Sequence, residues 1–243
     1  LMKEGAITPS GNFYLTYPYS HNISRLTPAG EITFVGGFSK DDPSISYCPA
    51  DNPIFAYPVS MSFNSDGSKL YVANRGRFVT VIDTAKDEPT KKIMVSGSAT
   101  YISYNPTLNR ILISQTVDSK ISVIDAKNDT IISEIKTGIR PRQAIINTTS
   151  GDTYVPTVLS NAITVIHPDL SISEIKLDSE PIDGEYDAVS DRLFVTTFNS
   201  AFAIDGKTNK VLKALPEFRN NRVAVAAGKI VFTDAFKDHF NVI

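Results

Sequence analysis

The clearest copy of a repeating unit is Ser65-Asp66-Gly67-Ser68-Lys69-Leu70-Tyr71-Val72-Ala73-Asn74, followed by FVTVID at residues 78–83. Each apolar run is only a few residues long and ends at turn residues. A third run at 92–95 and a fourth at 101–104 complete the set. Four short runs of this kind, rich in β-branched and aromatic residues, predict a four-stranded antiparallel sheet.

The same unit recurs along the chain at intervals of about forty residues. Further copies begin near residues 109, 151, 191 and 229, and a divergent copy precedes them at 10–26. The spacings between equivalent isoleucines, from Ile82 to Ile243, are 42, 42, 38 and 39. Stacked units of this length predict an all-β fold, a β-propeller of six four-stranded blades, formed as a single domain by residues 1–243. The alternative is a fragment of a seven-bladed propeller.

Two features depart from the regular repeat. An insertion at about 39–55 contains several prolines and Cys48. The last copy stops after its third strand, and we expect Leu1–Lys3 to supply the fourth strand and close the ring, because an open array leaves strand edges unpaired.

Composition agrees with an all-β chain and excludes several classes of function. Ile and Val together number 44 in the 243 residues, against 12 Leu, which is the balance of a strand-rich protein. The net charge of −2 and the absence of Trp argue against nucleic acid as a partner. No apolar run is long enough for a transmembrane helix. Glycosylation-type triplets at Asn22, Asn128 and Asn147 favour an extracytoplasmic location, whether secreted, periplasmic or at the cell surface.

The stretch LYVANRGRFVTVIDTAKDEPTKKIMVSG resembles the YVTN-type β-propeller repeat, in which a Tyr-Val-x-Asn strand precedes a Val-Ile-Asp strand. The stretch NISRLTPAGEITFVGGF is more similar to an NHL-type repeat. Both resemblances imply a β-propeller. Members of these families include surface proteins, binding scaffolds and a few enzymes, so the resemblance leaves the function open.

Polar residues at the ends of strands have structural explanations. Asp83, Asp125 and Asp205 each end a strand before a turn, where we expect the carboxylate to accept hydrogen bonds from backbone amides two residues on. Five glycines fall where we expect turns that need a positive φ: Gly67, Gly97, Gly138, Gly151 and Gly184.

The chain lacks the known catalytic signatures. It has no Gly-x-Ser-x-Gly, Walker or HExxH motif. We expect His21 and His167 to lie solvated near turns, and Cys48 has no identifiable activating base. His239 belongs to the last hairpin.

Candidate binding residues come from the loops that lead into the innermost strand of each predicted blade, because these loops line the central funnel of a propeller. The ligand-binding candidates are Tyr57, Tyr101, Arg140, Arg142, Arg219, Asn221 and Arg222. The arginines present planar forks that suit an anionic group. The alternative is a solvated funnel whose charges compensate one another.

A second interpretation uses the acidic residues of the same loops. Glu4, Asp183 and Glu185, with Asn221, offer oxygen ligands for a divalent cation such as calcium. This set is similar to the metal site of gluconolactonase-type six-bladed propellers, which would make Glu4 and Asp183 catalytic in a metal-dependent lactonase or ester hydrolase.

The sequence therefore predicts a non-enzymatic binding or scaffold protein that needs no cofactor. Its partner would be a protein or a small anionic ligand at the funnel mouth. The metal-dependent hydrolase is the alternative function.

Overall fold

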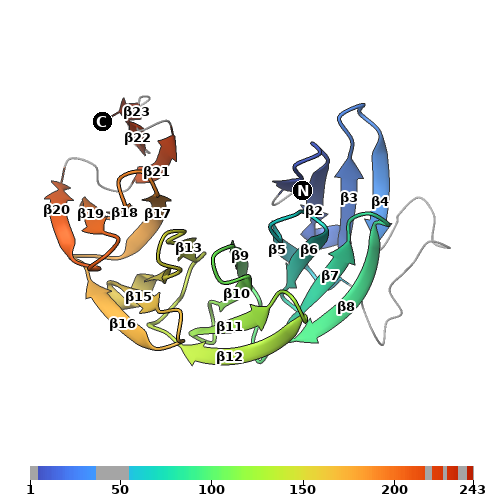
Figure 1. Ribbon diagram of the computed structural model, residues 1–243, viewed down its shortest axis with the longest axis horizontal. Helices are drawn as coiled ribbons and strands as arrows, with labels where there is room; N and C mark the ends of the chain where they lie inside the picture. The colour runs from blue at the N-terminus through green and yellow to red at the C-terminus, as the bar shows by residue number, and fades with distance from the viewer. Residues whose placement is uncertain (1–4, 37–54, 217–220, 227–228, 235–239, 243) are drawn as a thin grey trace. The chain divides into compact units, whose positions relative to one another are not determined.

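The protein is all-β. The computed structural model describes residues 5–36, 55–216, 221–226, 229–234 and 240–242, and it contains no α-helix in that part of the chain. The described strands form five four-stranded sheets and one three-stranded sheet, each an antiparallel meander in sequence order (Figure 1). Short 3₁₀ turns, η1 (Pro18–Ser20) and η3 (Val158–Ser160), join two of the strand pairs. None of the described helices is long and apolar enough to cross a membrane.

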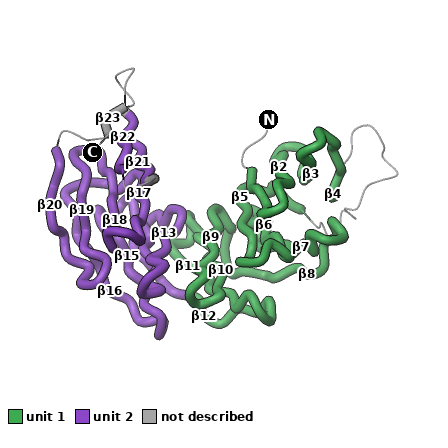
Figure 2. The backbone as a smooth tube through the Cα atoms, turned by 45° about the horizontal axis from the view of Figure 1, so that its top comes forward, with its two compact units in different colours: residues 1–134 green, residues 135–243 purple. Residues whose placement is uncertain are grey.

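The structure divides into two compact units, residues 1–134 and 135–243 (Figure 2). The division falls within a strand, and the single-domain prediction for residues 1–243 stays a prediction. The strands of the first three sheets are β1 (Gly5–Ile7), β2 (Phe13–Tyr17), β3 (Asn22–Leu26), β4 (Ile32–Gly36), β5 (Pro58–Phe63), β6 (Lys69–Asn74), β7 (Phe78–Asp83), β8 (Glu88–Met94), β9 (Tyr101–Asn105), β10 (Arg110–Gln115), β11 (Lys120–Asp125) and β12 (Thr130–Lys136).

The second unit continues the same pattern. Its strands are β13 (Ile145–Ile146), β14 (Thr153–Thr157), β15 (Ala162–Ile166), β16 (Ile172–Lys176), β17 (Pro181–Asp187), β18 (Arg192–Thr197), β19 (Ala201–Asp205), β20 (Val211–Leu215), β21 (Asn221–Ala226), β22 (Lys229–Asp234) and β23 (Phe240–Val242). The insertion predicted at 39–55 lies, except for buried Phe55, outside the described residues, as do Cys48, His239 and Leu1–Lys3.

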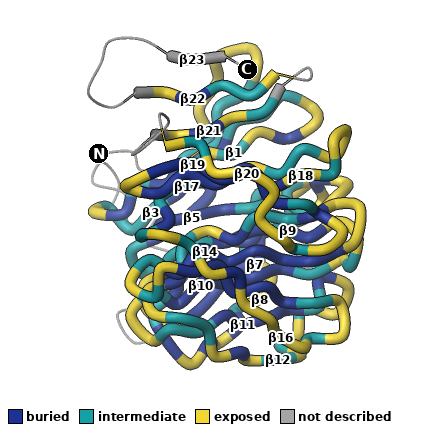
Figure 3. Tube along the Cα trace, turned by 90° about the vertical axis from the view of Figure 1, so that its left-hand side faces the viewer, coloured by how far each residue is buried: buried dark blue, intermediate teal, exposed yellow. Residues whose placement is uncertain are grey.

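Burial follows the position of a strand within its sheet. The middle strands β7 and β10 are almost wholly buried, whereas the last strands β12 and β16 expose every second residue or more (Figure 3). In unit 1, apolar side chains of the β5–β8 sheet pack against those of the β9–β12 sheet. A middle strand is covered on both faces, which explains its continuous run of β-branched residues.

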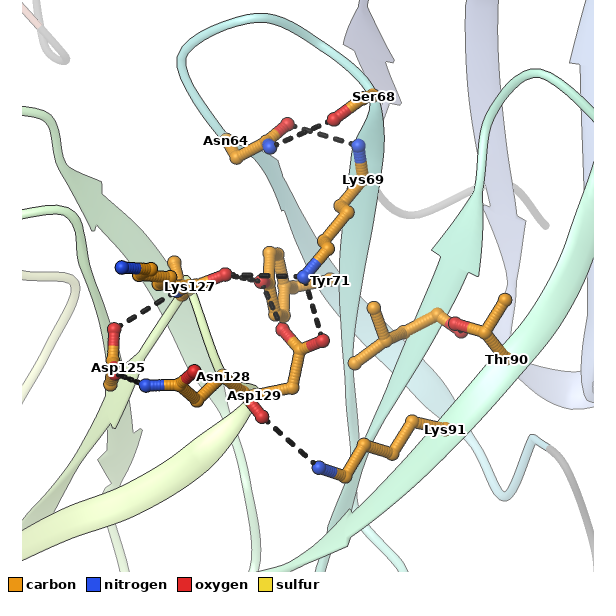
Figure 4. A network of polar contacts seen from close by, with 12 residues as sticks. Asn64, Ser68, Lys69, Tyr71, Thr90, Lys91, Asp125, Lys127, Asn128 and Asp129 are labelled. Atoms are coloured by element: carbon orange, nitrogen blue, oxygen red, sulfur yellow. Dashed lines mark hydrogen bonds and ion pairs between the residues drawn. The ribbon is translucent and has the colours of Figure 1, made fainter.

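Polar contacts add to this packing between neighbouring sheets. Tyr71 in β6 donates from its hydroxyl to Asp129, which lies in the turn between β11 and β12, and Lys69 forms an ion pair with the same carboxylate at 2.7 Å (Figure 4). Tyr71 is fully buried. Its hydroxyl therefore has a partner inside the protein, as a buried polar group requires.

The turn prediction for the three aspartates is confirmed. Asp83 accepts a hydrogen bond from the amide of Ala85 at 2.9 Å, and Asp125 does the same with Lys127. Asp205 accepts from the amide of Thr208 at 2.7 Å. These carboxylates hold hairpin turns between strands and are committed to that structural role.

The glycine prediction is right at two positions and wrong at three. Gly67 and Gly151 have φ values of 72° and 85°. Gly97, Gly138 and Gly184 do not have a positive φ. Close approach explains them instead: a Cβ on Gly138 would lie 2.7 Å from Thr157 Oγ1, and one on Gly184 would lie 3.0 Å from the carbonyl of Phe194.

Candidate functional site

The first strand of three sheets is reached through a loop of the same design. In each, one residue precedes a proline, and its carbonyl accepts a hydrogen bond at 3.3 Å from the turn that links the second and third strands of the same sheet. We call this the lead-in residue. The lead-in residues, with their donors in parentheses, are Tyr57 (Arg75), Arg140 (Val158) and Glu180 (Phe198).

This loop design shows which of the predicted residues occupy the same position in different sheets. Tyr57 and Arg140 are both lead-in residues, and both have a left-handed backbone, with φ of 58° and 60°. Twelve non-glycine residues of the described chain have a positive φ, most of them in turns, so this backbone shows a shared loop geometry and does not by itself mark a functional position. Asp183, by contrast, lies inside β17, three residues beyond Glu180. Asp183 was predicted in the loop before its strand, as were Tyr101, Glu185 and Arg222, which also lie in strands.

In unit 1, Tyr57 is the centre of an aromatic and cationic cluster. The Arg75 guanidinium carbon lies 4.9 Å from the centroid of the Tyr57 ring. Tyr19 meets the same ring edge-on with centroids 5.4 Å apart, and it is 72% exposed. His21 packs at 6.2 Å. We call Tyr19, His21, Tyr57 and Arg75 the Tyr57 cluster.

Hydrogen bonds fix the geometry of the Tyr57 cluster. The backbone amide of Tyr57 donates to His21 Nδ1 at 2.9 Å. Because Nδ1 accepts, the proton of the neutral His21 ring is on Nε2. A side-chain hydrogen bond with Tyr19, followed by partial desolvation, raises the pKa of the Tyr57 hydroxyl above its ordinary value. Tyr57 is thus held by its backbone and by its ring.

Three sequence segments far apart build the Tyr57 cluster. Tyr19 belongs to η1, and His21 directly follows it with φ of 52°. Tyr57 comes from the loop before β5, and Arg75 from the turn after β6. The prediction identified Tyr57 but missed the other three residues. The only sequence signal for them is that they follow the second strand of their repeats, so their turns lie beside the lead-in loops.

In unit 2, the structure brings together Arg142, Asp183 and Arg222. Arg142 donates from Nη1 to the carbonyl of Ile182 at 3.2 Å, where the pairing of β17 with β18 shifts register. Arg222 and Asp183 form an ion pair at 3.6 Å, and Asp183 Oδ2 accepts from the amide of Val223 at 3.2 Å. Arg222 lies within β21, with its side chain 71% exposed.

Glu185 follows Asp183 on the same side of β17, because alternate residues of a strand share a face. Partial desolvation, with the Asp183 charge second, raises the pKa of Glu185 even though its side chain reaches solvent. Two neighbouring carboxyl groups repel each other when both are ionised. An incoming cation would relieve that repulsion.

The remaining predicted residues are less informative. Tyr101 opens β9 and is half-buried, and Arg140 is exposed. Glu4, Arg219 and the side chain of Asn221 lie outside the described residues. Within the described ranges, no three His, Cys, Asp or Glu side chains gather as a metal would need. Because Glu4 and Asn221 belong to the predicted calcium set, that set stays a prediction.

The expectation for two of the histidines is wrong. His21 and His167 were expected to be solvated, but both are half-buried and hydrogen-bonded. Each side chain has a specific partner that the sequence spacing did not reveal.

Comparisons with solved structures show the fold. Virginiamycin B lyase from Staphylococcus aureus is 16% identical with a TM-score of 0.74, covering 100% of this chain and 83% of that chain. A streptogramin B lyase is 15% identical with a TM-score of 0.72, covering 100% and 79%. A chain of the Mitotic Checkpoint Complex is 9% identical with a TM-score of 0.77, covering 99% and 72%.

These likenesses and the repeated four-stranded sheets show that the chain is an all-β β-propeller. The number of blades stays a prediction. No family model matches the chain, and no curated protein matches it. Identities this low carry no activity from one propeller to another.

Proposed function

We propose that the protein is a β-propeller binding protein whose ligand docks in unit 1, at the Tyr57 cluster on the lead-in loop before β5. The observation that carries the proposal is the gathering of the exposed Arg75 and Tyr19 around the Tyr57 ring, with the Tyr57 backbone held by His21. Tyr57 packs against the core of unit 1 and its hydroxyl has a hydrogen bond with Tyr19, so Tyr19 and Arg75 are the exposed groups of the cluster.

The chemistry of the Tyr57 cluster selects the class of ligand. The exposed Arg75 guanidinium offers a fork for a carboxylate or phosphate, and the Tyr57 and Tyr19 rings offer faces and edges for a flat group. A small aromatic anion satisfies both. A protein partner with an acidic segment is the other class of ligand for such a surface.

Other propellers provide support of a general kind. A catalytically inactive variant of virginiamycin B lyase from Staphylococcus aureus has been crystallised with quinupristin, at 14% identity to this chain. Ligand binding is therefore compatible with this fold. The metal-dependent hydrolase has no comparable support among the described residues, because Glu4 is not among them and Asp183 is committed to Arg222 and to the amide of Val223.

The test uses 4-hydroxyphenylacetate as an aromatic anion and tyrosol as its neutral counterpart. Binding is measured by chemical-shift changes of backbone amides in the full chain. We expect the anion to shift Tyr57 and Arg75, and Arg75→Gln to weaken its binding by about tenfold, the value of one charge-assisted hydrogen bond.

The matched control is Arg110→Gln. Arg110 is the first residue of β10, the second strand of its sheet. Arg75 follows the last residue of β6, the second strand of its own sheet, so the two arginines lie at opposite ends of equivalent strands. Binding should be unchanged in this variant. Shifts spread evenly over the surface, or equal affinity of wild type and Arg75→Gln, would overturn the proposal.

A further inference from the structure

Three side chains form a continuous hydrogen-bonded row across one sheet of unit 2. Ser173 Oγ lies 2.9 Å from His167 Nε2, and His167 Nδ1 lies 3.0 Å from Asp152 Oδ1. Asp152 precedes β14, His167 follows β15, and Ser173 lies in β16. A hydroxyl, an imidazole and a carboxylate in this order are the groups of an activated serine.

The strand register explains why the three side chains meet. Thr153 pairs with Ile166, so Asp152 stands opposite His167 at the next position of the ladder. Ser173 pairs with Val165, two residues before His167. Alternate residues of a strand share a face, so all three side chains project from the same side of the sheet.

The hydrogen bonds of Asp152 determine which ring nitrogen of His167 carries the proton. Asp152 is 7% exposed, and its second oxygen, Oδ2, accepts from Asn209 Nδ2 at 3.1 Å. Asn209 Oδ1 in turn accepts from the hydroxyl of Tyr154 at 2.7 Å. An ionised carboxylate only accepts, so the His167 proton is on Nδ1. The lone pair of Nε2 then faces Ser173, as a general base requires.

The other repeats show that this row is particular to one blade. At the position of the Asp152–His167 pair three of the other sheets have a cation opposite an acid: Lys69 with Asp83, Arg110 with Asp125, and Arg192 with Asp205. At the position of Ser173 the sheets of β8 and β20 have Lys91 and Lys213. The β12 strand has Ser133 in the same sequence context as Ser173, so the serine alone is not particular to this blade. The Asp152–His167 pair is, and the turn role of the aspartates does not account for it.

We propose that Ser173 is an activated nucleophile toward small, unhindered activated esters, with His167 as its base and Asp152 as a positioning residue. This inference concerns a different site from the Tyr57 cluster and does not depend on the proposed ligand. Ser173 is exposed on the last strand of its sheet, so a reagent can reach it from solvent.

The reaction balances with groups present in the row. Ser173 Oγ forms a bond to the acyl carbon while its proton moves to His167 Nε2. The ester C–O bond breaks, and the departing oxygen takes that proton. Water then attacks the acyl-serine, His167 again accepts and returns a proton, and the carboxylic acid leaves with Ser173 restored.

A backbone donor lies next to the nucleophile in sequence. The His167 amide donates to the carbonyl of Ser171, so His167 and Ser171 are a hydrogen-bonded pair of the antiparallel ladder. The pair two positions further along such a ladder is hydrogen-bonded as well. Ser173 thus bonds to Val165, and the amide of Glu174 is directed away from β15. Since β16 ends the sheet, this amide is oriented to serve a developing oxyanion.

The first experiment treats the full chain with a fluorophosphonate probe at about pH 8, because a general base must be unprotonated to accept the serine proton. In this reaction a P–O bond to Ser173 forms as the P–F bond breaks. We expect peptide mass spectrometry to place the label on Ser173. Ser173→Ala should remove it, and His167→Gln should slow labelling by about 100-fold or more.

The matched control is Ser171→Ala. Ser171 is also exposed, lies on the same hairpin, and donates from Oγ to Asp169 at 2.6 Å, but it has no imidazole partner. Labelling of Ser173 should continue unchanged in this variant. A label spread over several serines, or an equal rate in His167→Gln, would overturn the proposal.

A second measurement tests the positioning role of Asp152 without relying on reactivity. The chain has only three histidines, so ¹⁵N imidazole shifts can be assigned. We expect the Nδ1–H tautomer for His167 in the wild type and a shift toward Nε2–H in Asp152→Asn, with slower labelling in the same variant. Folding is checked from the spectrum itself. A His167 tautomer that is already Nε2–H in the wild type would overturn the proposal.

Discussion

Tyr71 donates its hydroxyl to Asp129 Oδ1 at 2.5 Å, from a buried strand to a turn of the next sheet (Figure 4). The relationship recurs in the chain. Tyr14 donates to Asp87 at 2.6 Å in unit 1, and Tyr154 donates to Asn209 at 2.7 Å in unit 2. The three acceptors all have a φ between 55° and 58°. Asp and Asn are the L-residues that best tolerate this conformation. The same residue can therefore adopt the left-handed turn position and accept the hydrogen bond from the tyrosine hydroxyl.

Tyr71→Phe should lower the free energy of unfolding by about 1 kcal/mol, because it removes a buried hydroxyl donor while Lys69 still donates to the same two acceptors. The acceptors are Asp129 and the carbonyl of Ala126. Urea denaturation measures the change. Tyr104→Phe is the control, because the Tyr104 hydroxyl donates to Asn109 in an exposed hydrogen bond of the same unit. We expect this variant to change the free energy of unfolding by less than about 0.5 kcal/mol. Equal effects of the two variants would contradict the structural role of Tyr71.

Alkaline pH should destabilise the fold through the buried tyrosines. Desolvation raises the pKa of Tyr154 to about 12, whereas the unfolded chain titrates near its ordinary value of 10. The unfolded state therefore loses its proton first, so the stabilisation is complete below about pH 10 and declines between about pH 10 and 12. Burial also raises the pKa of Tyr14 and Tyr71. Urea midpoints of Tyr154→Phe should fall less steeply than those of wild type over this range, and parallel curves would count against the shift.

The strain at Tyr57 can be measured by comparing two substitutions at one position. At φ of 58°, alanine carries the steric cost of a left-handed L-residue and glycine does not, so Tyr57→Gly should be about 1 kcal/mol more stable than Tyr57→Ala. Tyr101 opens β9 with an ordinary backbone, and there the order should reverse. The denaturation midpoints of the four variants measure this difference. If the glycine variant were the more stable one at both positions, or the alanine variant at both, Tyr57 would not be strained.

Arg222 and Asp183 should contribute unequally to stability although they form one ion pair. Arg222→Gln should change the free energy of unfolding by less than about 0.5 kcal/mol, because the pair is long and the arginine is 71% exposed. Asp183→Ala should cost about 1–2 kcal/mol, because it also removes the acceptor for the amide of Val223. A double-mutant cycle at low and high salt separates the two effects. A coupling energy above about 1 kcal/mol that salt does not reduce would contradict this assignment.

Much of the fold could be predicted from local patterns. The run from Ser65 to Asp83 contains two strands and a turn, and the structure has β6 and β7 in those places. The turn role of Asp125 was likewise predictable, because an aspartate bonds amides only two residues away. Gly138 was misread, because a side chain at this position would clash with Thr157 at the end of β14, and no local pattern reports that contact.

The candidate sites were less predictable for the same reason. Tyr57 was found because its loop has a fixed place in the repeat, but Arg75 and His21 reach it from turns 18 and 36 residues away. His167 was expected to be solvated because its sequence neighbours are turn residues. Its partners Asp152 and Ser173 come from adjacent strands, and strand register placed them there.

The sequence by itself determined the all-β class, the repeat of four strands and the hairpin turns, because each depends on residues within a few positions of one another. Only the tertiary structure decided which side chains meet across sheets and strands: Tyr71 with Asp129, Arg75 with Tyr57, and Ser173 with His167. The physical reason is that strand register and sheet packing, and not sequence distance, determine which side chains lie opposite one another. A shift of one residue in register would turn every one of them to the other face.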